Sequence, residues 1–133
     1  MDDILYKQEC YNIVGAAMAV YNDKGHGFLE PVYQECMEIE LGIRNIQMSA
    51  QVPFPLAYRG RALKQKYVAD LVCYEQIIVE VKAVSALCDS HRSQVLNYLK
   101  ASGLELGLLI NFGHPGRLEY ERIVRTHAHH GPQ

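Results

Sequence analysis

The segment from Leu104 to Phe112 is a nearly continuous apolar run, and it constrains the fold more than any other part of the chain. A strand that is apolar on both faces needs cover on both faces, as in sheets whose strands run parallel. Before this run, the sequence predicts a strand over Ile77 to Val84 and then a helix over about Asp89 to Ala101. A strand, a helix and a second strand in this order predict a parallel pair joined by a helical crossover. The chain is therefore expected to build a sheet with helices packed against it.

Two more helices are expected before the sheet. The first covers about Ile4 to Tyr21, and the second starts after Gly27 with Pro31 in its first turn, where the missing N–H costs nothing. Helical spacing predicts the buried faces: Tyr6, Cys10, Ile13, Ala17 and Tyr21 in the first helix, and Leu29, Val32, Tyr33, Cys36, Ile39 and Ile43 in the second.

Three further strands are expected. In the segment 52–58, apolar residues alternate with Pro53 and Pro55, and because proline has no N–H for a ladder, this segment is expected at an edge. A strand over Lys64 to Cys73 precedes the strand that begins at Ile77, and Leu118 to Val124 supplies the last one.

The predicted order is α-α-β-β-β-α-β-(β), which is an α/β (α+β) fold with a mixed β-sheet flanked by helices. We expect one domain over residues 1–125 and a flexible tail over 126–133.

Composition narrows the class of protein. Of the 133 residues, 49% are hydrophobic and 21% are charged, which is typical of a globular chain. The formal net charge of −2 excludes a strongly basic nucleic-acid coat protein but allows a local basic patch. No apolar run approaches the ~18 residues of a membrane span, and the start is acidic where a secretion signal would be basic. We expect a cytoplasmic protein without a membrane partner, with reduced, buried thiols at Cys10, Cys36, Cys73 and Cys88.

Charged residues interrupt two of the predicted strands. Glu80 and Lys82 are two positions apart, so they project from one face of their strand. If the turn over residues 74–76 has three residues, Asp70 lies directly across from Glu80, with Cβ atoms roughly 4.5–5.5 Å apart. A two-residue turn would instead send the two acids to opposite faces.

Two carboxylates that close repel each other, and a divalent cation removes the conflict. Oxygen ligands at this spacing suit Mg²⁺ or Mn²⁺, which also bind phosphate, and Lys82 can hold a phosphate oxygen or orient a water. The alternative is a solvated sheet face with a cross-strand ion pair.

The crossover helix carries a polar face. It is expected to be capped by Asp89 or Ser90 and to end before Gly103. His91, Gln94 and Tyr98 share one of its faces, where Gln94 can contact a metal-bound water and Tyr98 can donate from its hydroxyl. The alternative is that Tyr98 is a core aromatic and Gln94 a boundary residue.

Glu30 borders the apolar arc of the second helix. It is expected either to complement the helix dipole as a first-turn acid or to reach the sheet as a further metal ligand.

Three motifs resemble those of one group of proteins, and the resemblance covers the chain from about Ile4 to Val124. Gly27-Phe28-Leu29-Glu30-Pro31-Val32-Tyr33 is similar to the motif that names the GxxExxY protein family. Asp70 with Glu80-Val81-Lys82 resembles the split acidic motif of the PD-(D/E)XK nuclease superfamily. Gln94-Val95-Leu96-Asn97-Tyr98 resembles the QxxxY motif of its RecB-like branch.

The resemblance implies a restriction-endonuclease-like fold and a metal-dependent nuclease. It also implies roles for particular residues: metal ligation by Glu30, Asp70 and Glu80, catalysis by Lys82, and support of catalysis by Gln94 and Tyr98. The expected activity is Mg²⁺- or Mn²⁺-dependent hydrolysis of phosphodiester bonds in DNA, without strong sequence specificity, and RNA is the alternative substrate that the sequence leaves open.

Basic residues support a nucleic-acid partner. Arg59, Arg61, Lys64 and Lys66 cluster around one hairpin, with Arg92 and Lys100 on the crossover helix, enough for a handful of phosphate contacts. Ordinary solvated cations are the alternative. A homodimer or a partner protein is expected to strengthen the binding of DNA.

Two other classes of function remain open: a catalytically inert nuclease-fold scaffold that binds nucleic acid or protein, and an enzyme acting on a small phosphate ester, although the chain has no P-loop.

Overall fold

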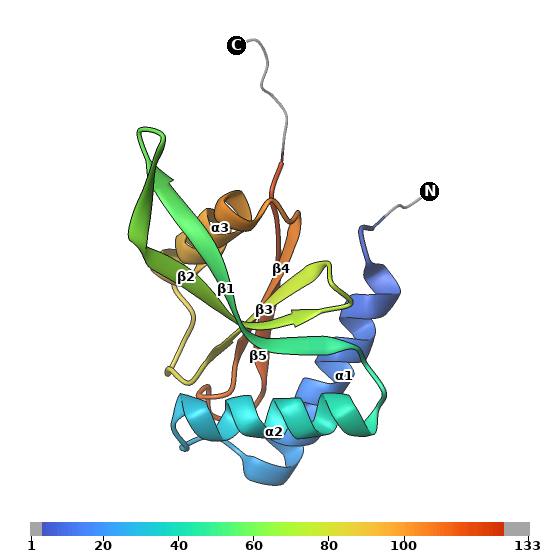
Figure 1. The fold of residues 1–133 in the computed structure, drawn as a ribbon. Coiled ribbons are helices and arrows are strands. Elements are labelled where there is room, and N and C mark those ends of the chain that lie inside the picture. The colour runs from blue at the N-terminus through green and yellow to red at the C-terminus, as the bar shows by residue number, and fades with distance from the viewer. Residues whose placement is uncertain (1–3, 127–133) are drawn as a thin grey trace.

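The structure is a computed structural model that describes residues 4–126. These residues form three helices and five strands (Figure 1). In chain order the elements are α1 (Lys7–Lys24), α2 (Glu30–Ile43), β1 (Met48–Tyr58), β2 (Arg61–Cys73), β3 (Ile77–Lys82), α3 (Asp89–Ser102), β4 (Leu106–Asn111) and β5 (Glu119–Val124). The tail expected over 126–133 lies outside the described residues except for Thr126.

The strands form one mixed sheet in the order β1-β2-β3-β4-β5. Strands β3 and β4 pair in parallel, and the other neighbours pair antiparallel. The parallel pair is joined through α3, as the apolar run and its preceding helix predict, and β1 with its two prolines lies at an edge as expected. The α+β fold with a mixed sheet and flanking helices is therefore confirmed.

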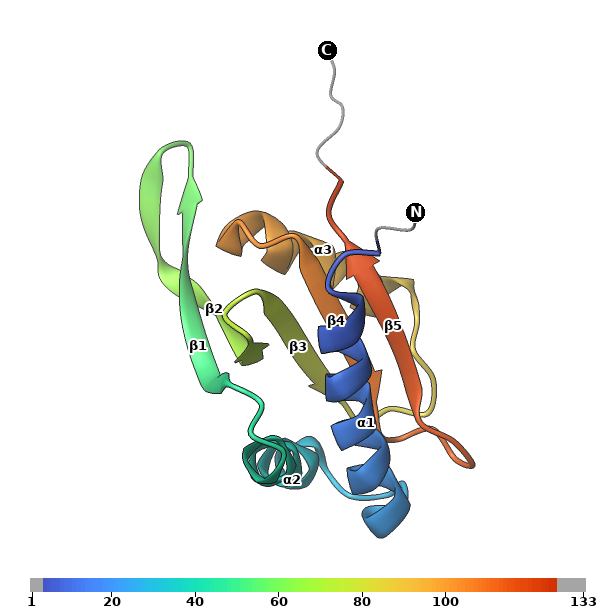
Figure 2. The ribbon, with the colours of Figure 1, turned by 90° about the vertical axis from the view of Figure 1, so that its right-hand side faces the viewer.

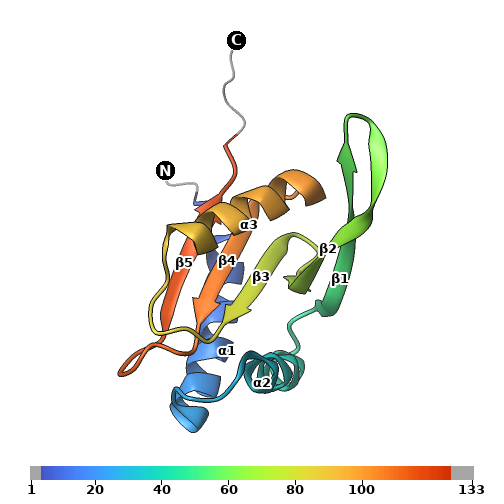
Figure 3. The ribbon, with the colours of Figure 1, turned by 90° about the vertical axis from the view of Figure 1, so that its left-hand side faces the viewer.

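Helices cover both faces of the sheet (Figures 2 and 3). Helices α1 and α2 bury one face, in a cluster that includes Ile13, Tyr33 and Phe112. Helix α3 covers the other face through Val95 and Leu99. A Cβ atom at Gly107 would come within 2.6 Å of Val95 Cγ1, so the glycine lets α3 approach β4 closely.

The expected buried face of the second helix is mostly wrong. The residues of α2 that are fully buried are Tyr33, Met37 and Leu41, at a spacing of four, whereas four of the residues expected on the buried face are exposed: Leu29, Val32, Ile39 and Ile43. Because α1 covers α2 on one side and strands β1 and β3 cover it on another, a narrow stripe is buried rather than a broad face.

The cap of the crossover helix also differs from the expectation. Cys88 precedes the first helical residue, and its N–H donates to His91 Nδ1 at 3.0 Å, so neither Asp89 nor Ser90 is the N-cap. Gly103 ends the helix with φ of 79°, as predicted.

The cysteines differ in exposure. Cys10 and Cys73 are buried, Cys36 is half-buried, and Cys88 is exposed, so the expected burial is wrong for Cys88 because it lies at a helix start outside the core. No helix within residues 4–126 is long and apolar enough to cross a membrane.

Candidate active site

The turn over residues 74–76 has the three-residue length on which the predicted site depends. The last regular pair of the β2–β3 ladder is Leu71 with Val79. Continued by one position, this register sets Asp70 opposite Glu80. Adjacent backbones therefore bring together two acids that lie ten residues apart in the sequence.

The regular backbone pairing of β2 with β3 stops at these two acids and leaves an opening between the strands. The Asp70 N–H donates to Glu80 Oε2 at 3.2 Å, and the Val81 N–H donates to Asp70 Oδ2 at 2.8 Å. The carboxylates thus accept the hydrogen bonds that backbone carbonyls would accept in a regular ladder. Side-chain alternation also breaks here, since Ala69 packs with the α3 cluster and Leu71 with the opposite cluster. Both acids are held in the opening by the backbone of the other strand.

The neighbouring strand pair is irregular at the same place. The regular pairing of β1 with β2 leaves out Gln51 and Asp70. Gln51 also has a φ of 52°, which is outside the range of a regular strand. Helix α2 takes up the freed backbone group, because Gln34 Nε2 donates to the Asp70 carbonyl oxygen at 2.9 Å. Asp70 is therefore fixed through its backbone by α2 and through its side chain by β3.

Tyr67 fixes Glu80 from the other side of the sheet. Its hydroxyl donates to Glu80 Oε2 at 2.6 Å, and its ring stacks on Tyr98 of α3, with ring centroids 3.4 Å apart, and on Phe54 of β1, at 5.8 Å. Glu80 is only 5% exposed. The aromatic stack thus sets the position of a buried carboxylate.

Two of the residues predicted on α3, Gln94 and Tyr98, contact Lys82 and Tyr67, which neighbour the acids. Lys82 Nζ donates to Gln94 Oε1 at 3.0 Å, which holds the ammonium group toward the helix. Lys82 lies two positions from Glu80 on β3, and its positive charge offsets part of the increase that burial causes in the pKa of Asp70 and of Glu80. Tyr98 is half-buried against Tyr67.

Glu30 is the first residue of α2, and a buried tyrosine fixes the loop before it. The Tyr33 hydroxyl donates to the Gly25 carbonyl oxygen at 2.6 Å and accepts from the Phe28 N–H at 3.1 Å. Gly27 lies between them with φ of 116°, a conformation that glycine adopts readily. Gly27 and Tyr33 thus fix the loop that leads into α2 at Glu30.

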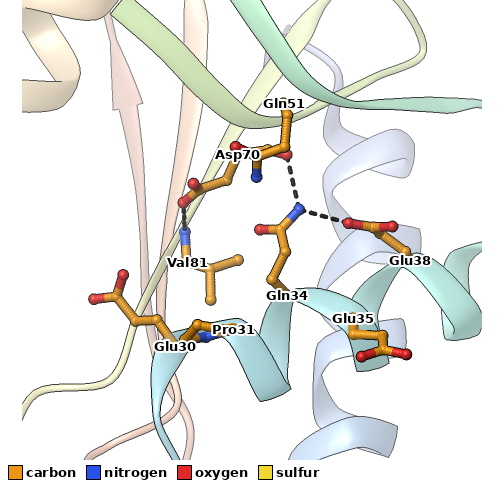
Figure 4. Close-up of a pocket in the computed structure, with 8 residues that line it drawn as sticks. All are labelled: Glu30, Pro31, Gln34, Glu35, Glu38, Gln51, Asp70 and Val81. Carbon is orange, nitrogen blue, oxygen red and sulfur yellow. Dashed lines mark hydrogen bonds between the residues drawn. The ribbon is translucent and has the colours of Figure 1, made fainter.

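Glu30 and Asp70 line one pocket of about 540 Å³ between α2 and the sheet (Figure 4). The carboxylate of Glu30 is turned toward that of Asp70, whose pKa is raised by the charge of Glu30. The residues that line the pocket are four acids and four uncharged residues: Glu30, Glu35, Glu38, Asp70, Pro31, Gln34, Gln51 and Val81. The lining suits a cation and would repel a bare phosphate.

The two central acids are held in unfavourable surroundings for two negative charges. Burial, and then the charge of Asp70, raise the pKa of Glu80 to about 7. Burial is also the main cause of the raised pKa of Asp70. A bound cation would reverse both effects.

Glu30, Asp70 and Glu80 do not form a complete metal-binding site. Within residues 4–126, no three His, Cys, Asp or Glu side chains lie close enough to enclose an ion. Oδ2 of Asp70 and Oε2 of Glu80 already accept hydrogen bonds, and Glu30 is exposed. Oxygen donors are present, but the ligand set is not assembled around one point.

Two residues of α3 have structural partners instead. His91 caps its own helix, and Arg92 pairs with Asp89 at 2.8 Å and with Glu121 of β5 at 2.7 Å. The structure therefore does not bring His91 to the acids, and Arg92 is already engaged by carboxylates.

Sequence reasoning missed Gln34 and Tyr67. Gln34 lies four positions after Glu30, on the same face of α2, which was the available signal. Tyr67 lies three positions before Asp70 on its strand, and periodicity alone would send it to the opposite face. The irregularity at Asp70 is what brings both residues to the site.

Comparison with solved structures supports the fold. The crystal structure of SSO0001 is similar over 92% of this chain, with a TM-score of 0.59 and 22% sequence identity. The match spans 61% of SSO0001, so the chain corresponds to less than two thirds of that protein. A search of the curated proteins found no match. A family model described as the PD-(D/E)XK nuclease superfamily matches residues 7–123, and the chain therefore belongs to that superfamily.

Proposed function

We propose that this protein is a metal-dependent nuclease that hydrolyses phosphodiester bonds in DNA, without strong intrinsic sequence specificity, as a cytoplasmic member of the GxxExxY group with the QxxxY motif. The observation that carries the proposal is the opening between β2 and β3, where Asp70 and Glu80 are held together beside Lys82. Superfamily membership supports nuclease chemistry and the use of divalent metal ions.

The donor set fits Mg²⁺ or Mn²⁺, which prefer carboxylate and amide oxygens. Asp70, Glu80 and Glu30 would hold the ion. Gln34 supplies a further argument, because its Oε1 is buried and has no hydrogen-bond partner among the described residues. Its Nε2 donates to two acceptors, Asp70 O and Glu38 Oε2, which fixes the amide orientation. An unpartnered carbonyl oxygen beside acids favours a bound cation or its water.

The ion, when bound, lowers the pKa of water and stabilises charge on the reacting phosphate. In the reaction a water oxygen attacks phosphorus, a P–O bond to a sugar breaks, and the leaving sugar oxygen takes up a proton. Lys82, oriented by Gln94, presents a positive charge where negative charge develops. Gln94 and Tyr98 position Lys82 and the Tyr67 ring.

Cleavage of plasmid and linear DNA in Mg²⁺ or Mn²⁺ tests the proposal. Asp70→Ala and Lys82→Ala are each expected to lower the rate on the order of 100-fold or more. Asp23→Ala and Lys24→Ala are matched controls, because this acid and lysine pair with each other at the end of α1. Activity that persists in Asp70→Ala would contradict the proposal.

An inert nuclease-fold scaffold is the second candidate. It is favoured by the hydrogen bonds that already occupy Asp70 Oδ2 and Glu80 Oε2. Calorimetry discriminates the two: a nuclease binds Mn²⁺ with a dependence on Asp70 and Glu80, and an inert scaffold does not. Pairing with a second copy or a partner protein stays a prediction, which light scattering tests.

A further inference from the structure

The hairpin formed by β1 and β2 extends beyond the rest of the sheet as an arm (Figures 2 and 3). All residues from 57 to 66 are exposed. Arg59, Arg61, Lys64 and Lys66 lie in this stretch, and no acid occurs between Glu40 and Asp70. The formal charge of the whole chain is −2, so these four cations leave −6 for the remainder. Positive charge is therefore concentrated on one projection of an acidic molecule.

The cations of the arm are available to a partner. The ion pairs found within residues 4–126 engage Lys24, Arg44 and Arg92, and none of them involves the arm. Exposed cations without acidic neighbours attract a polyanion strongly at low salt. Among the described residues, the cations of the arm thus form no ion pair that would compete with a partner.

The arm is held in a defined direction. Tyr58 pairs with Arg61 across a two-residue turn, in which Arg59 has φ of 50° and Gly60 has φ of 76°. At the root of the arm, the Phe54, Tyr67 and Tyr98 rings stack, which ties both strands to α3. A preorganised arm loses less conformational entropy on binding than a flexible loop.

We propose that the arm binds the phosphate backbone of duplex DNA on one side of the phosphodiester bond that is cleaved. The proposal rests on the proposed function, because it takes the opening at Asp70 as the place of the reacting phosphate. Strand β2 carries both features: Arg61 lies nine positions from Asp70 and Lys66 lies four. At ~3.3 Å per residue, these separations are about 30 Å and about 13 Å.

The longer of these distances is close to one turn of a double helix, and the shorter one corresponds to less than half a turn. One turn of B-DNA is about 34 Å long, so the tip of the arm would reach phosphates nearly one turn from the reacting bond. The arm has charged rather than apolar character, apart from Tyr58 and Leu63, so it is suited to contacts with phosphates, which carry no sequence information. This agrees with the weak sequence specificity proposed above.

Binding at several salt concentrations tests the arm. Anisotropy of a labelled 30-base-pair duplex is measured in metal-free buffer, where cleavage is not expected. The variant Arg59→Gln/Arg61→Gln/Lys64→Gln/Lys66→Gln is expected to reduce the slope of log K against log salt by up to ~3.6, about 0.9 per phosphate contact. The pair Arg59→Gln/Arg61→Gln alone is expected to reduce it by up to ~1.8.

The matched control removes the same charge elsewhere. Lys7 and Arg117 are also exposed and belong to none of the ion pairs found among the described residues, so Lys7→Gln/Arg117→Gln is the control for Arg59→Gln/Arg61→Gln and should leave the slope unchanged. An equal loss in the control would mean that net charge alone matters, and it would overturn the proposal, as would an unchanged slope in the arm variant. Tighter binding of an RNA duplex, or equal displacement by polyglutamate, would overturn the assignment to DNA.

Failure of the arm and failure of the nuclease are distinguishable. If the arm proposal alone is wrong, Mg²⁺-dependent cleavage persists while binding does not depend on the arm. If the nuclease proposal alone is wrong, binding depends on the arm and no cleavage occurs with any duplex. Circular dichroism of each variant shows that the fold is retained, which is expected because only exposed side chains change.

Discussion

Opposing effects act on the pKa of Glu80, and the resulting value makes the ionisation of this acid sensitive to pH. Burial and Asp70 raise its pKa to about 7, while hydrogen bonds from Tyr67 and the Asp70 N–H act in the other direction. An acid whose pKa is raised in the folded state holds its proton more tightly there than in the unfolded chain. Its protonation therefore stabilises the fold below the unfolded pKa near 4.5, and that stabilisation is lost as the pH rises through about 7.

We expect the metal-free protein to lose stability between pH 5 and pH 8 by roughly 1–3 kcal/mol through this group. Urea denaturation in the presence of a chelator measures it. Glu80→Gln should flatten the dependence, because glutamine does not titrate. An equally steep dependence in Glu80→Gln would assign the effect to other groups.

The hydroxyl of Tyr67 is predicted to stabilise the ionised form of Glu80. Tyr67→Phe keeps the ring stack with Phe54 and Tyr98 and removes only the donor at 2.6 Å. At pH 8 the free energy of unfolding should fall by roughly 1–3 kcal/mol, as expected for a hydrogen bond to a charged group. Tyr58→Phe on the exposed arm is the control and should change it little. Equal effects of the two variants would argue against this role.

At the residue scale, contacts between neighbouring strands were predictable from the sequence, whereas contacts made by packing of distant elements were not. The pairing of Asp70 with Glu80 depends on one short turn, so the sequence narrowed it to two registers, and the three-residue turn of the structure selects the one that sets the acids opposite each other. The contacts of Gln34 with Asp70 depend on how α2 meets a break in strand pairing, 36 residues away in the chain. No local pattern in the sequence predicts such a contact.

At the scale of elements, the contact between α3 and β4 depends on the missing side chain of Gly107. In Gly107→Ala the new methyl group would meet Val95 Cγ1 at 2.6 Å, so either the Val95 side chain or the helix must shift. We expect a loss of roughly 1–3 kcal/mol in the free energy of unfolding by denaturant titration. Gly42→Ala in α2 has open space around it and should be neutral or stabilising. A neutral Gly107→Ala would show that the contact is looser than described.

The order and type of the elements were predictable because each has a strong local signal. The prolines predicted an edge strand, and the apolar run predicted a central one. The buried stripe of α2 was not predictable in the same way, because Ile39 and Ile43 are as apolar as Met37 and Leu41. Which of them is buried depends on the angle at which α1 and the sheet meet the helix.

At the scale of the whole molecule, metal binding should stabilise the fold. The opening at Asp70 joins β2, β3 and α2, so a cation there would tie together three elements. At a Mn²⁺ concentration 100 times its Kd, the gain is about 2.7 kcal/mol. Calorimetry should show a higher Tm that returns to its starting value with a chelator.

Asp70→Asn should abolish this shift, measured against its own metal-free Tm, and Asp23→Asn should retain it because that residue lies at the end of α1. A shift of the same size in Asp70→Asn would locate the cation elsewhere.

The two edges of the sheet bear on how the protein behaves when crowded. An exposed edge strand is a template for aggregation by strand addition. Pro53 and Pro55 remove two N–H donors from β1, and β5 carries Glu119, Glu121 and Arg122. Many copies gathered along one polymer would therefore have little tendency to fuse into fibrils, and the molecule should stay dispersed at high local concentration.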